Sequence, residues 1–354
     1  MIRRPASRGS LLFVLLAALI VSILVHRSRF LFGLLLEDGR RDAVFPSELL
    51  SPASDREWNE TAVIPKIIHQ TYKTKDNIPE HWRAGQQAVK ELHPDWEYKV
   101  CSSASSLPEE EHMEKKLSNQ KQFWSDEDSH SFISTHYPAF LPTFESYAHP
   151  IQRVDALRYF LLHHYGGIYL DLDLAPYRSF TPLLQFPAFA CLTAPTGISN
   201  DILGSVPHHP FYKLVISNLE AYNRNWLSGY ITVMYTTGPL FFSVLWIQYL
   251  RSLGGNMNAM NRVKVLVPGG TAGDSYGFFK NVQGGSWHGK ETEVVFWMGR
   301  HWVFVTIFGF VVGFTVVSVF WWIWITMGKR WRERPVTEKR GSYELWIEDG
   351  RYEY

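Results

Sequence analysis

Two carboxylates stand two residues apart in an otherwise apolar run that extends from Ile168 to Leu174. The run predicts a buried strand, and side chains two apart on a strand share a face, so Asp171 and Asp173 should point the same way. Adjacent carboxylates repel each other and lose hydration on burial unless a cation lies between them. Carboxylate oxygens suit Mg²⁺ or Mn²⁺, which proteins often hold together with the phosphates of a substrate. The alternative is a solvated strand face that happens to carry two Asp residues.

The segment from Ile151 to Tyr165 predicts a helix that leads into this strand, because its apolar residues recur at helical spacing. Gly166 and Gly167 are expected to end the helix, since glycine adopts the left-handed conformation without strain. Asp155 and Arg158 lie three residues apart on one face of the helix. An acid and a guanidinium beside a metal-binding pair suit a sugar hydroxyl and a diphosphate. These surroundings favour a metal and diphosphate site over a solvated strand face.

The segment RVDALRYFLLHHYGGIYLDLDLAP resembles the core of the DXD-containing glycosyltransferases of the GT-A fold, and more narrowly glycosyltransferase family 32. That family includes fungal α-1,6-mannosyltransferases of the Golgi and the catalytic subunits of inositol phosphoceramide mannosyltransferase. The strings IPKIIHQTYK and GGSWHG match further motifs of the family in the same order, so the resemblance covers residues 63–289. It implies an α/β fold with a mixed sheet flanked by helices, and metal-dependent hexosyl transfer with retention of anomeric configuration.

The resemblance also carries roles onto matching residues. Asp171 and Asp173 would be the catalytic pair that binds Mn²⁺ or Mg²⁺, and His288 of GGSWHG would complete the metal site. Asp155 and Arg158 would hold the transferred sugar and the diphosphate. Further contacts to the donor substrate are expected from His69, Gln70, Asn200, Asp201 and Trp287. The resemblance does not identify a catalytic nucleophile.

Some of these roles have plain structural alternatives. Without the resemblance, His69 would be an ordinary structural histidine near the end of a predicted first strand. The segment 197–201 predicts a turn with polar tips, and the alternative role for Asn200 and Asp201 is to cap that turn. The chain also departs from the family pattern in carrying Tyr72 where relatives often have Trp, and Lys290 after the late histidine.

Two apolar segments frame the predicted catalytic domain. Residues 303–328 carry no charge and predict a transmembrane helix, and the basic residues that follow predict a cytosolic tail. Residues 10–25 lack a convincing cleavage site after them, so we interpret them as an uncleaved signal anchor. The predicted parts are cytosolic residues 1–9, a signal anchor at 10–25, a stem at 26–62, a lumenal GT-A domain at 63–302, a transmembrane helix at 303–328 and a cytosolic tail at 329–354.

The composition sets limits on partners and on covalent structure. A net charge of +1 over 354 residues shows no excess of positive charge of the kind that indicates a nucleic-acid-binding protein. Two cysteines, Cys101 and Cys191, make no disulfide scaffold, and the sequence does not place them within bonding distance. Asn59 begins an N-x-T sequon and is expected to be glycosylated if its side of the membrane is lumenal.

The two predicted spans refine the expected function. A lumenal domain held to the bilayer at both ends most resembles the inositol phosphoceramide mannosyltransferase branch, because protein-glycan mannosyltransferases typically have only the N-terminal anchor. That branch implies GDP-mannose as donor, a sphingolipid acceptor, a Golgi or endoplasmic reticulum membrane and a multi-spanning regulatory subunit as partner. The alternatives are a Golgi α-1,6-mannosyltransferase acting on protein-linked glycans and a catalytically silent membrane scaffold. Intact Asp171, Asp173 and His288 argue against the scaffold.

Overall fold

The computed structural model describes the greater part of the chain, which forms two compact units, residues 1–288 and 289–354. The described residues are 15–16, 18–23, 25–26, 29, 33–34, 36, 39–45, 49, 62–72, 78–98, 123–193, 196–226, 228–254, 258–267, 277–281, 293–294, 297–298 and 300–332. Asn59 and Cys101 lie outside them, as do Trp287 and His288. Cys191 is buried and forms no disulfide with any described residue.

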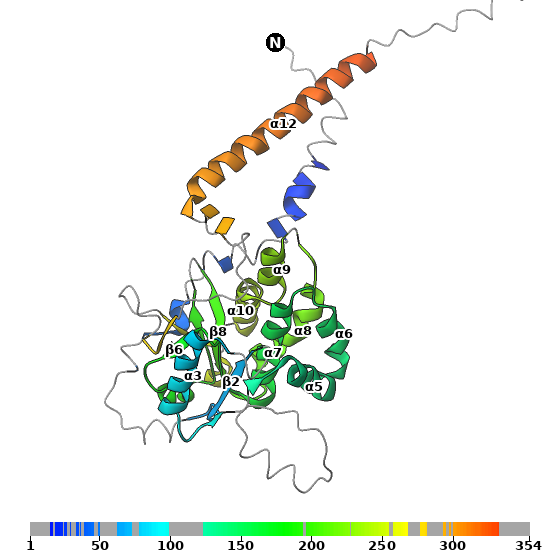
Figure 1. The fold of residues 1–354 in the computed structure, drawn as a ribbon. Coiled ribbons are helices and arrows are strands. Elements are labelled where there is room, and N and C mark those ends of the chain that lie inside the picture. Colours follow the sequence, from blue (N-terminus) through cyan, green and yellow to red (C-terminus); the bar gives the residue numbers. More distant parts are fainter. Residues whose placement is uncertain are drawn as a thin grey trace, which may run out of the picture. The chain divides into compact units, whose positions relative to one another are not determined.

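An eight-stranded sheet forms the centre of the first unit (Figure 1). Its strands are β1 (Ala43–Val44), β2 (Ile67–Thr71), β3 (Glu97–Tyr98), β4 (Phe123–Trp124), β5 (Gly167–Leu170), β7 (Ala188–Leu192), β8 (Ile198–Ser205) and β9 (Lys264–Leu266). Their order is β1-β9-β7-β8-β5-β2-β3, and β4 pairs with β2 beyond the end of β3. Only β8 runs antiparallel to its neighbours, β5 and β7, so the sheet is mixed, as predicted.

Helices cover both faces of this sheet. In the first unit they are α3 (Glu80–Leu92), α5 (Asp126–His136), α6 (Leu141–Ser146), α7 (Pro150–Tyr165), α8 (Pro210–Tyr222), α9 (Gly229–Thr236) and α10 (Pro239–Leu253). Short 3₁₀ turns are η1 (Arg40–Asp42), η4 (Pro138–Phe140), η5 (Thr181–Gln185) and η6 (Ala259–Asn261). Figure 1 shows α7, α8 and α10 on one side of the sheet and α3 on the other.

Two apolar cores lie on opposite faces of the sheet because successive side chains of a strand alternate. On β5, Tyr169 packs into the core beneath α7 and α10, while Ile168 and Leu170 pack into the core beneath α3 and η5. On β7, Ala190 faces the first core and Phe189 the second. The predicted helix at 151–165 is confirmed as α7. The sheet therefore holds the end of β5 rigidly between two packed layers.

The segment predicted as one strand from Ile168 to Leu174 is in fact interrupted, and this prediction was wrong. Strand β5 ends at Leu170, and a separate strand β6 (Leu174–Pro176) pairs with β10 (Phe279–Asn281) in a small second sheet. A hydrogen bond of 3.2 Å from the Leu174 amide to the Asp171 carbonyl closes the turn between them. Gly166 and Gly167, before β5, have φ of 68° and 93°, as expected of glycines that end a helix. The D-x-D motif therefore forms a turn instead of a strand face.

Hydropathy selects two helical stretches that differ in their environment. The most apolar 18 residues within 229–253, a range that includes α9 and α10, are 67% buried and belong to the core of the first unit. In the second unit, α12 (Trp302–Arg332) contains residues 302–326, of which none is buried and whose length and composition suffice to cross a membrane. The described residues of the predicted anchor, 15–16, 18–23 and 25, are helical and exposed. The predicted span at 303–328 lies within α12.

Candidate active site

The D-x-D turn places two carboxylates at the end of the central strand β5. Leu172, between them, is buried against Ile78 and Trp82, which directs the turn's middle side chain inward. The Asp171 amide donates to the Asp201 carbonyl at 2.9 Å, so the turn is also tied to β8. Asp171 and Asp173 stay partly exposed. The local fold thus anchors the turn by its backbone and by Leu172, and leaves its carboxylates accessible.

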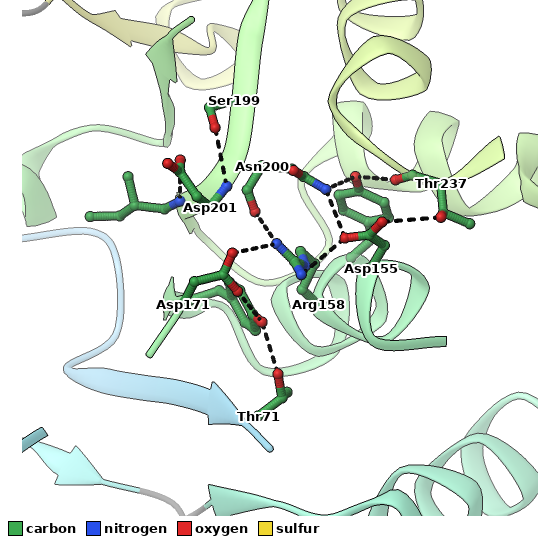
Figure 2. Close-up of polar contacts among 11 residues, drawn as sticks. Thr71, Asp155, Arg158, Asp171, Ser199, Asn200, Asp201 and Thr237 are labelled. Carbon is green, nitrogen blue, oxygen red and sulfur yellow. Dashed lines mark hydrogen bonds and ion pairs between the residues drawn. The ribbon is translucent and has the colours of Figure 1, made fainter. Parts of the chain in front are cut away.

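The Asp171 carboxylate is held from two sides (Figure 2). Tyr169 donates its hydroxyl to Oδ1 at 2.8 Å, and Arg158 Nη1 donates to Oδ2 at 3.2 Å. Since the Tyr169 proton goes to the carboxylate, its oxygen accepts from the Thr71 hydroxyl at 2.9 Å. The Arg158 guanidinium also lies 4.5 Å from the Tyr169 ring centre. Asp171 is therefore fixed by groups from α7, β5 and β2.

Behind Asp171, Arg158 joins it to a second carboxylate inside the domain. Arg158 Nη2 lies 2.9 Å from Asp155 Oδ1, and the two side chains are only 2% and 7% exposed. Asp155 also accepts from the Asn200 amide and from the Thr237 hydroxyl, each at 3.1 Å. Burial raises the pKa of Asp155 to about 6, while Arg158 opposes that rise. One guanidinium thus balances two carboxylates, which leaves this network with a negative charge.

Asp173 differs from Asp171 in its electrostatics. Burial, followed by the charges of Asp171 and Asp201, raises the pKa of Asp173 to about 7. Burial also raises the pKa of Asp201. The charges of Asp171 and Asp201 oppose the ionisation of Asp173, so a cation beside the D-x-D turn would be favourable. The carboxylate oxygens of the turn are of the kind that Mg²⁺ or Mn²⁺ prefers.

The other predicted site residues divide into two sets. Asn200 and Asp201 lie with the network, but on strand β8 and not on the predicted turn, because residues 198–205 form one strand that pairs with β5 and β7. His69 pairs with Tyr169 in the sheet, but its side chain turns towards the start of β5 and donates Nε2–H to the Gly166 carbonyl at 2.9 Å. Gln70 is buried within β2. Within the described part of the chain, no three His, Cys, Asp or Glu side chains form a metal-binding group.

The sequence interpretation missed several residues of this network. Tyr169 stands two before Asp171 on the same strand face, a spacing that the sequence does display. Thr71 stands at the carboxyl end of β2, the edge where ligand sites of α/β sheets gather. Thr237 follows Asp155 by 82 residues and reaches it only through the packing of α9 against α7. No local pattern marks Thr237.

Known proteins with similar sequences place this geometry in a family. The profile described as "Glycosyltransferase sugar-binding region containing DXD motif" matches residues 79–190. "Mannosyl phosphorylinositol ceramide synthase CSH1" of Saccharomyces cerevisiae is 39% identical over 340 residues, which cover 94% of this chain and 81% of that protein. "Inositol phosphoceramide mannosyltransferase 3" of Schizosaccharomyces pombe is 41% identical over 259 residues, covering 73% and 65% of the two chains.

A structural comparison finds the "PaToxG Glycosyltransferase", with a TM-score of 0.40 and 19% identity, covering 56% of this chain and 76% of that one. The sequence relationship, by contrast, extends over nearly the whole chain and includes the D-x-D turn with its supporting helix. The chain therefore belongs to the DXD-containing glycosyltransferases of family 32, in the group that includes the fungal inositol phosphoceramide mannosyltransferases.

Proposed function

We propose that this chain transfers mannose from GDP-mannose to inositol phosphoceramide, with retention of anomeric configuration. The observation that carries the proposal is the D-x-D turn, which is tied through Arg158 to the buried Asp155. The chain is 38% and 41% identical to two proteins named as inositol phosphoceramide mannosyltransferases. The acceptor follows from the relatives' names. GDP-mannose is the donor that the family resemblance implies. The anionic turn supports a diphosphate donor, because a cation bound there would accept a diphosphate.

We assign roles in this reaction to residues of the network. Asp171 and Asp173 bind Mn²⁺ or Mg²⁺ together with the donor diphosphate, and His288 and Trp287 contribute from the late motif. The cation supplies Lewis-acid stabilisation of the departing diphosphate. Asp155 accepts a hydrogen bond from a sugar hydroxyl.

The remaining residues orient this donor site. Arg158 sets the position of Asp171 and adds positive charge beside the diphosphate. Asn200 and Asp201 line the sugar, and Gln70 supports the edge formed by β2. His69 acts at a distance, by holding the junction between α7 and β5 through Gly166.

We also propose a membrane arrangement for this reaction. The domain at 63–302 lies in the lumen of the Golgi or endoplasmic reticulum, between a signal anchor at 10–25 and a span at 303–328. Both termini are cytosolic, and Asn59 in the stem carries a glycan. Attachment at both ends keeps the D-x-D turn near the bilayer surface, which suits a lipid headgroup as acceptor. A multi-spanning regulatory subunit accompanies the chain.

The test uses the full-length protein, purified in detergent, with Mn²⁺, inositol phosphoceramide and radiolabelled GDP-mannose. We expect label in a lipid product for the wild type and a loss of at least about a hundredfold for Asp173→Asn, in the range expected when an electrostatic contact to a developing charge is removed. Asp95→Asn, an exposed carboxylate in the turn after α3, is the matched control and should transfer at the wild-type rate.

Each other outcome selects a different function. Transfer to mannan oligosaccharides but not to the lipid would replace the sphingolipid acceptor by a glycan. Transfer of glucose from UDP-glucose in place of mannose would overturn the donor. Equal transfer by Asp173→Asn and wild type would contradict the role of the D-x-D turn. If no transfer occurred, even in native membranes that contain the partner subunit, the remaining function would be that of a catalytically silent scaffold.

A further inference from the structure

An exposed tryptophan stands just before α9, in a segment that we call the Trp226 loop (residues 223–226 and 228). The side chain of Trp226 is 50% exposed. The other described tryptophans of the first unit are buried, namely Trp82, Trp96, Trp124 and Trp246. A single exposed apolar side chain is common on protein surfaces, so the support and the position of Trp226 matter more than its exposure.

The Trp226 loop is held to two helices. The Trp226 amide donates to Thr232 Oγ1 at 2.9 Å, and the Trp226 ring lies 5.2 Å from the ring of Tyr235. Asn223, at the start of the loop, donates its side-chain amide to the Ser146 hydroxyl at 2.8 Å. These contacts fix the loop to α9 and to the end of α6. The exposure of the indole is therefore a built feature of the fold.

Helix α9 joins the Trp226 loop to the charged network of the site. Thr236 Oγ1 donates to the Thr232 carbonyl at 2.7 Å and accepts from Gln152 Nε2 at 2.7 Å. The next residue, Thr237, donates its hydroxyl to Asp155 at 3.1 Å (Figure 2). Hydrogen bonds thus run along α9 from the loop to the network. The loop therefore keeps a fixed position relative to Asp155.

The Trp226 loop lies at the outer end of α7, on the side where the D-x-D turn stands. Helix α7 leads directly into β5 and runs against it, so the first turn of α7 projects beyond Asp171. Arg158 contacts Asp171, and Pro150 precedes Arg158 by about two helical turns, roughly 12 Å. A Cβ at Gly229 would lie 3.1 Å from the ring of His149, the residue before α7. The loop and the first turn of α7 therefore form an outer rim of the site.

The N-terminal segment joins the domain at the same end of the sheet. Strand β8 runs antiparallel to β5, and Asp201 on β8 accepts from the Asp171 amide. Gly197, just before β8, lies further out than Asp201, and a Cβ there would meet Leu34 Cδ2 at 3.6 Å. The Leu34 carbonyl also accepts from the Thr196 hydroxyl. Because the exposed, helical residues of the predicted anchor precede Leu34, the anchor is attached at the edge of the sheet that carries the D-x-D turn.

We propose that Trp226 holds the rim of the site in the headgroup layer of the bilayer. The inference rests on the proposed sphingolipid acceptor, whose ceramide stays in the membrane while its headgroup reaches the D-x-D turn. The headgroup layer is only roughly 5–8 Å thick on each side of the hydrocarbon. A rim that projects roughly 12 Å along α7 therefore enters this layer when a headgroup reaches Asp171. An indole is favoured there, because it combines a large apolar ring with one hydrogen-bond donor.

Contact with the bilayer is measured on the full-length protein in phosphatidylcholine nanodiscs. A fluorophore is attached at Trp226→Cys or, with the indole kept, at Asn225→Cys, in a chain that carries Cys101→Ser. Cys191 is buried and stays in place. We expect nitroxides on the lipid headgroups to quench the fluorophore at both positions several-fold more strongly than at Lys213→Cys. Lys213 is the matched control, since it is exposed in the first turn of α8, which follows the far end of β8.

A second measurement separates the bilayer from the headgroup of the acceptor. In nanodiscs that contain inositol phosphoceramide, Trp226→Ala should raise the KM for the lipid several-fold, because the rim is no longer held against the membrane. Trp226→Tyr should recover most of this loss, because tyrosine is also favoured at the interface. With water-soluble glycerophosphoinositol as acceptor, the KM values of these variants should differ far less.

Three results would overturn the proposal. Quenching at positions 225 and 226 no stronger than at Lys213 would show that the rim lies away from the bilayer. A KM for the lipid that Trp226→Ala leaves unchanged would remove the role of the indole. An equal rise of KM for both acceptors would show that Trp226 binds the headgroup itself.

Failure of the proposed function gives a different result. The wild-type chain would then transfer mannose to neither acceptor, while the quenching would still report whether the rim contacts the bilayer. Near-ultraviolet circular dichroism shows whether each variant is folded. Asn225→Cys keeps the native indole, so the quenching stays decisive if Trp226→Cys does not fold.

Discussion

Two buried polar regions of the first unit satisfy their hydrogen bonds in opposite ways. Around Arg158, charged groups are removed from water and paired with each other, beside the D-x-D turn (Figure 2). Around His93, a neutral imidazole donates Nδ1–H to the Val89 carbonyl at 2.8 Å and accepts at Nε2 from the Phe180 amide at 2.9 Å. The imidazole also stacks on Phe180 and contacts Trp96, so that it joins α3 to the start of η5.

The difference between these regions separates function from stability. A buried ion pair loses hydration that its Coulomb energy barely recovers, so apolar groups of the same volume would often serve stability as well. A neutral hydrogen-bonded group has no such cost. The charged network lies where it fixes the Asp171 carboxylate and faces the proposed donor, whereas the His93 region lies within a core. We infer that the first region is retained for its electrostatics and the second for its packing.

The largest expected effect comes from removing the shared charge of the first region. Arg158→Met leaves Asp155 buried without its cation, and we expect the free energy of unfolding to fall by about 3–5 kcal/mol. Urea denaturation in detergent measures this value. Arg153→Met is the control on the same helix, because among the described residues Arg153 bonds the Tyr147 carbonyl and no other group. The double variant Asp155→Asn/Arg158→Met should recover part of the loss. If Arg158→Met were as stable as Arg153→Met, the comparison between the regions would fail.

The second region predicts a loss of stability in acid. Burial lowers the pKa of His93 from 6.5 to about 4, so the unfolded chain takes up a proton before the folded chain does. The neutral imidazole of His93 makes its full contribution to the free energy of unfolding above pH 6.5. As the pH falls towards 4, this contribution is lost, and the total loss is ~3 kcal/mol. His93→Gln should be less stable at neutral pH and should show a shallower decline below pH 6.5.

Urea denaturation at a series of pH values measures that decline. His130→Gln, which changes an exposed histidine, is the control and should keep the wild-type slope. His209, whose pKa burial also lowers to about 4, contributes a second decline in the same window. The His93→Gln curve must therefore retain part of the slope. A His93→Gln curve parallel to that of wild type would show that His93 is not the titrating group.

The sequence predicted the parts of the fold that depend on local pattern. The spacing in α7 and the glycines after it mark the helix and its end. The break in the strand at Asp171 could not be predicted, because an apolar run does not show that Leu174 pairs with another sheet. Asn200 was expected on a turn because its segment is short and polar. Its place on β8 depends on pairing with two other strands, and a local sequence pattern does not reveal such pairing.

A smaller effect with the opposite sign is expected within the D-x-D turn. The pKa of Asp173 is raised to about 7, so ionisation of its carboxylate destabilises the folded chain as the pH rises from 3.8 to about 7. Without added divalent cation, Asp173→Asn should raise the free energy of unfolding above pH 7 by about 2 kcal/mol, since solvent screening at this half-buried site reduces the full linkage value. The gain should vanish below the ordinary pKa of Asp. Asp95→Asn serves again as the control. If the Asp173→Asn chain were less stable than wild type at high pH, ionised Asp173 would not destabilise the folded chain.

The smallest expected effect tests whether the charged network extends to the end of α9. Thr237→Val removes the hydroxyl that donates to Asp155 and leaves the Thr237 carbonyl free to accept from Tyr159. A hydrogen bond to a carboxylate matters only while that group is ionised, and the pKa of Asp155 is about 6. We therefore expect a loss of about 1 kcal/mol above that pH and a smaller loss below it. Thr143→Val, on α6, should show no such dependence. A loss that is equal on both sides of pH 6 would mean that Thr237 contributes packing alone, and the charged region would then end at Asp155.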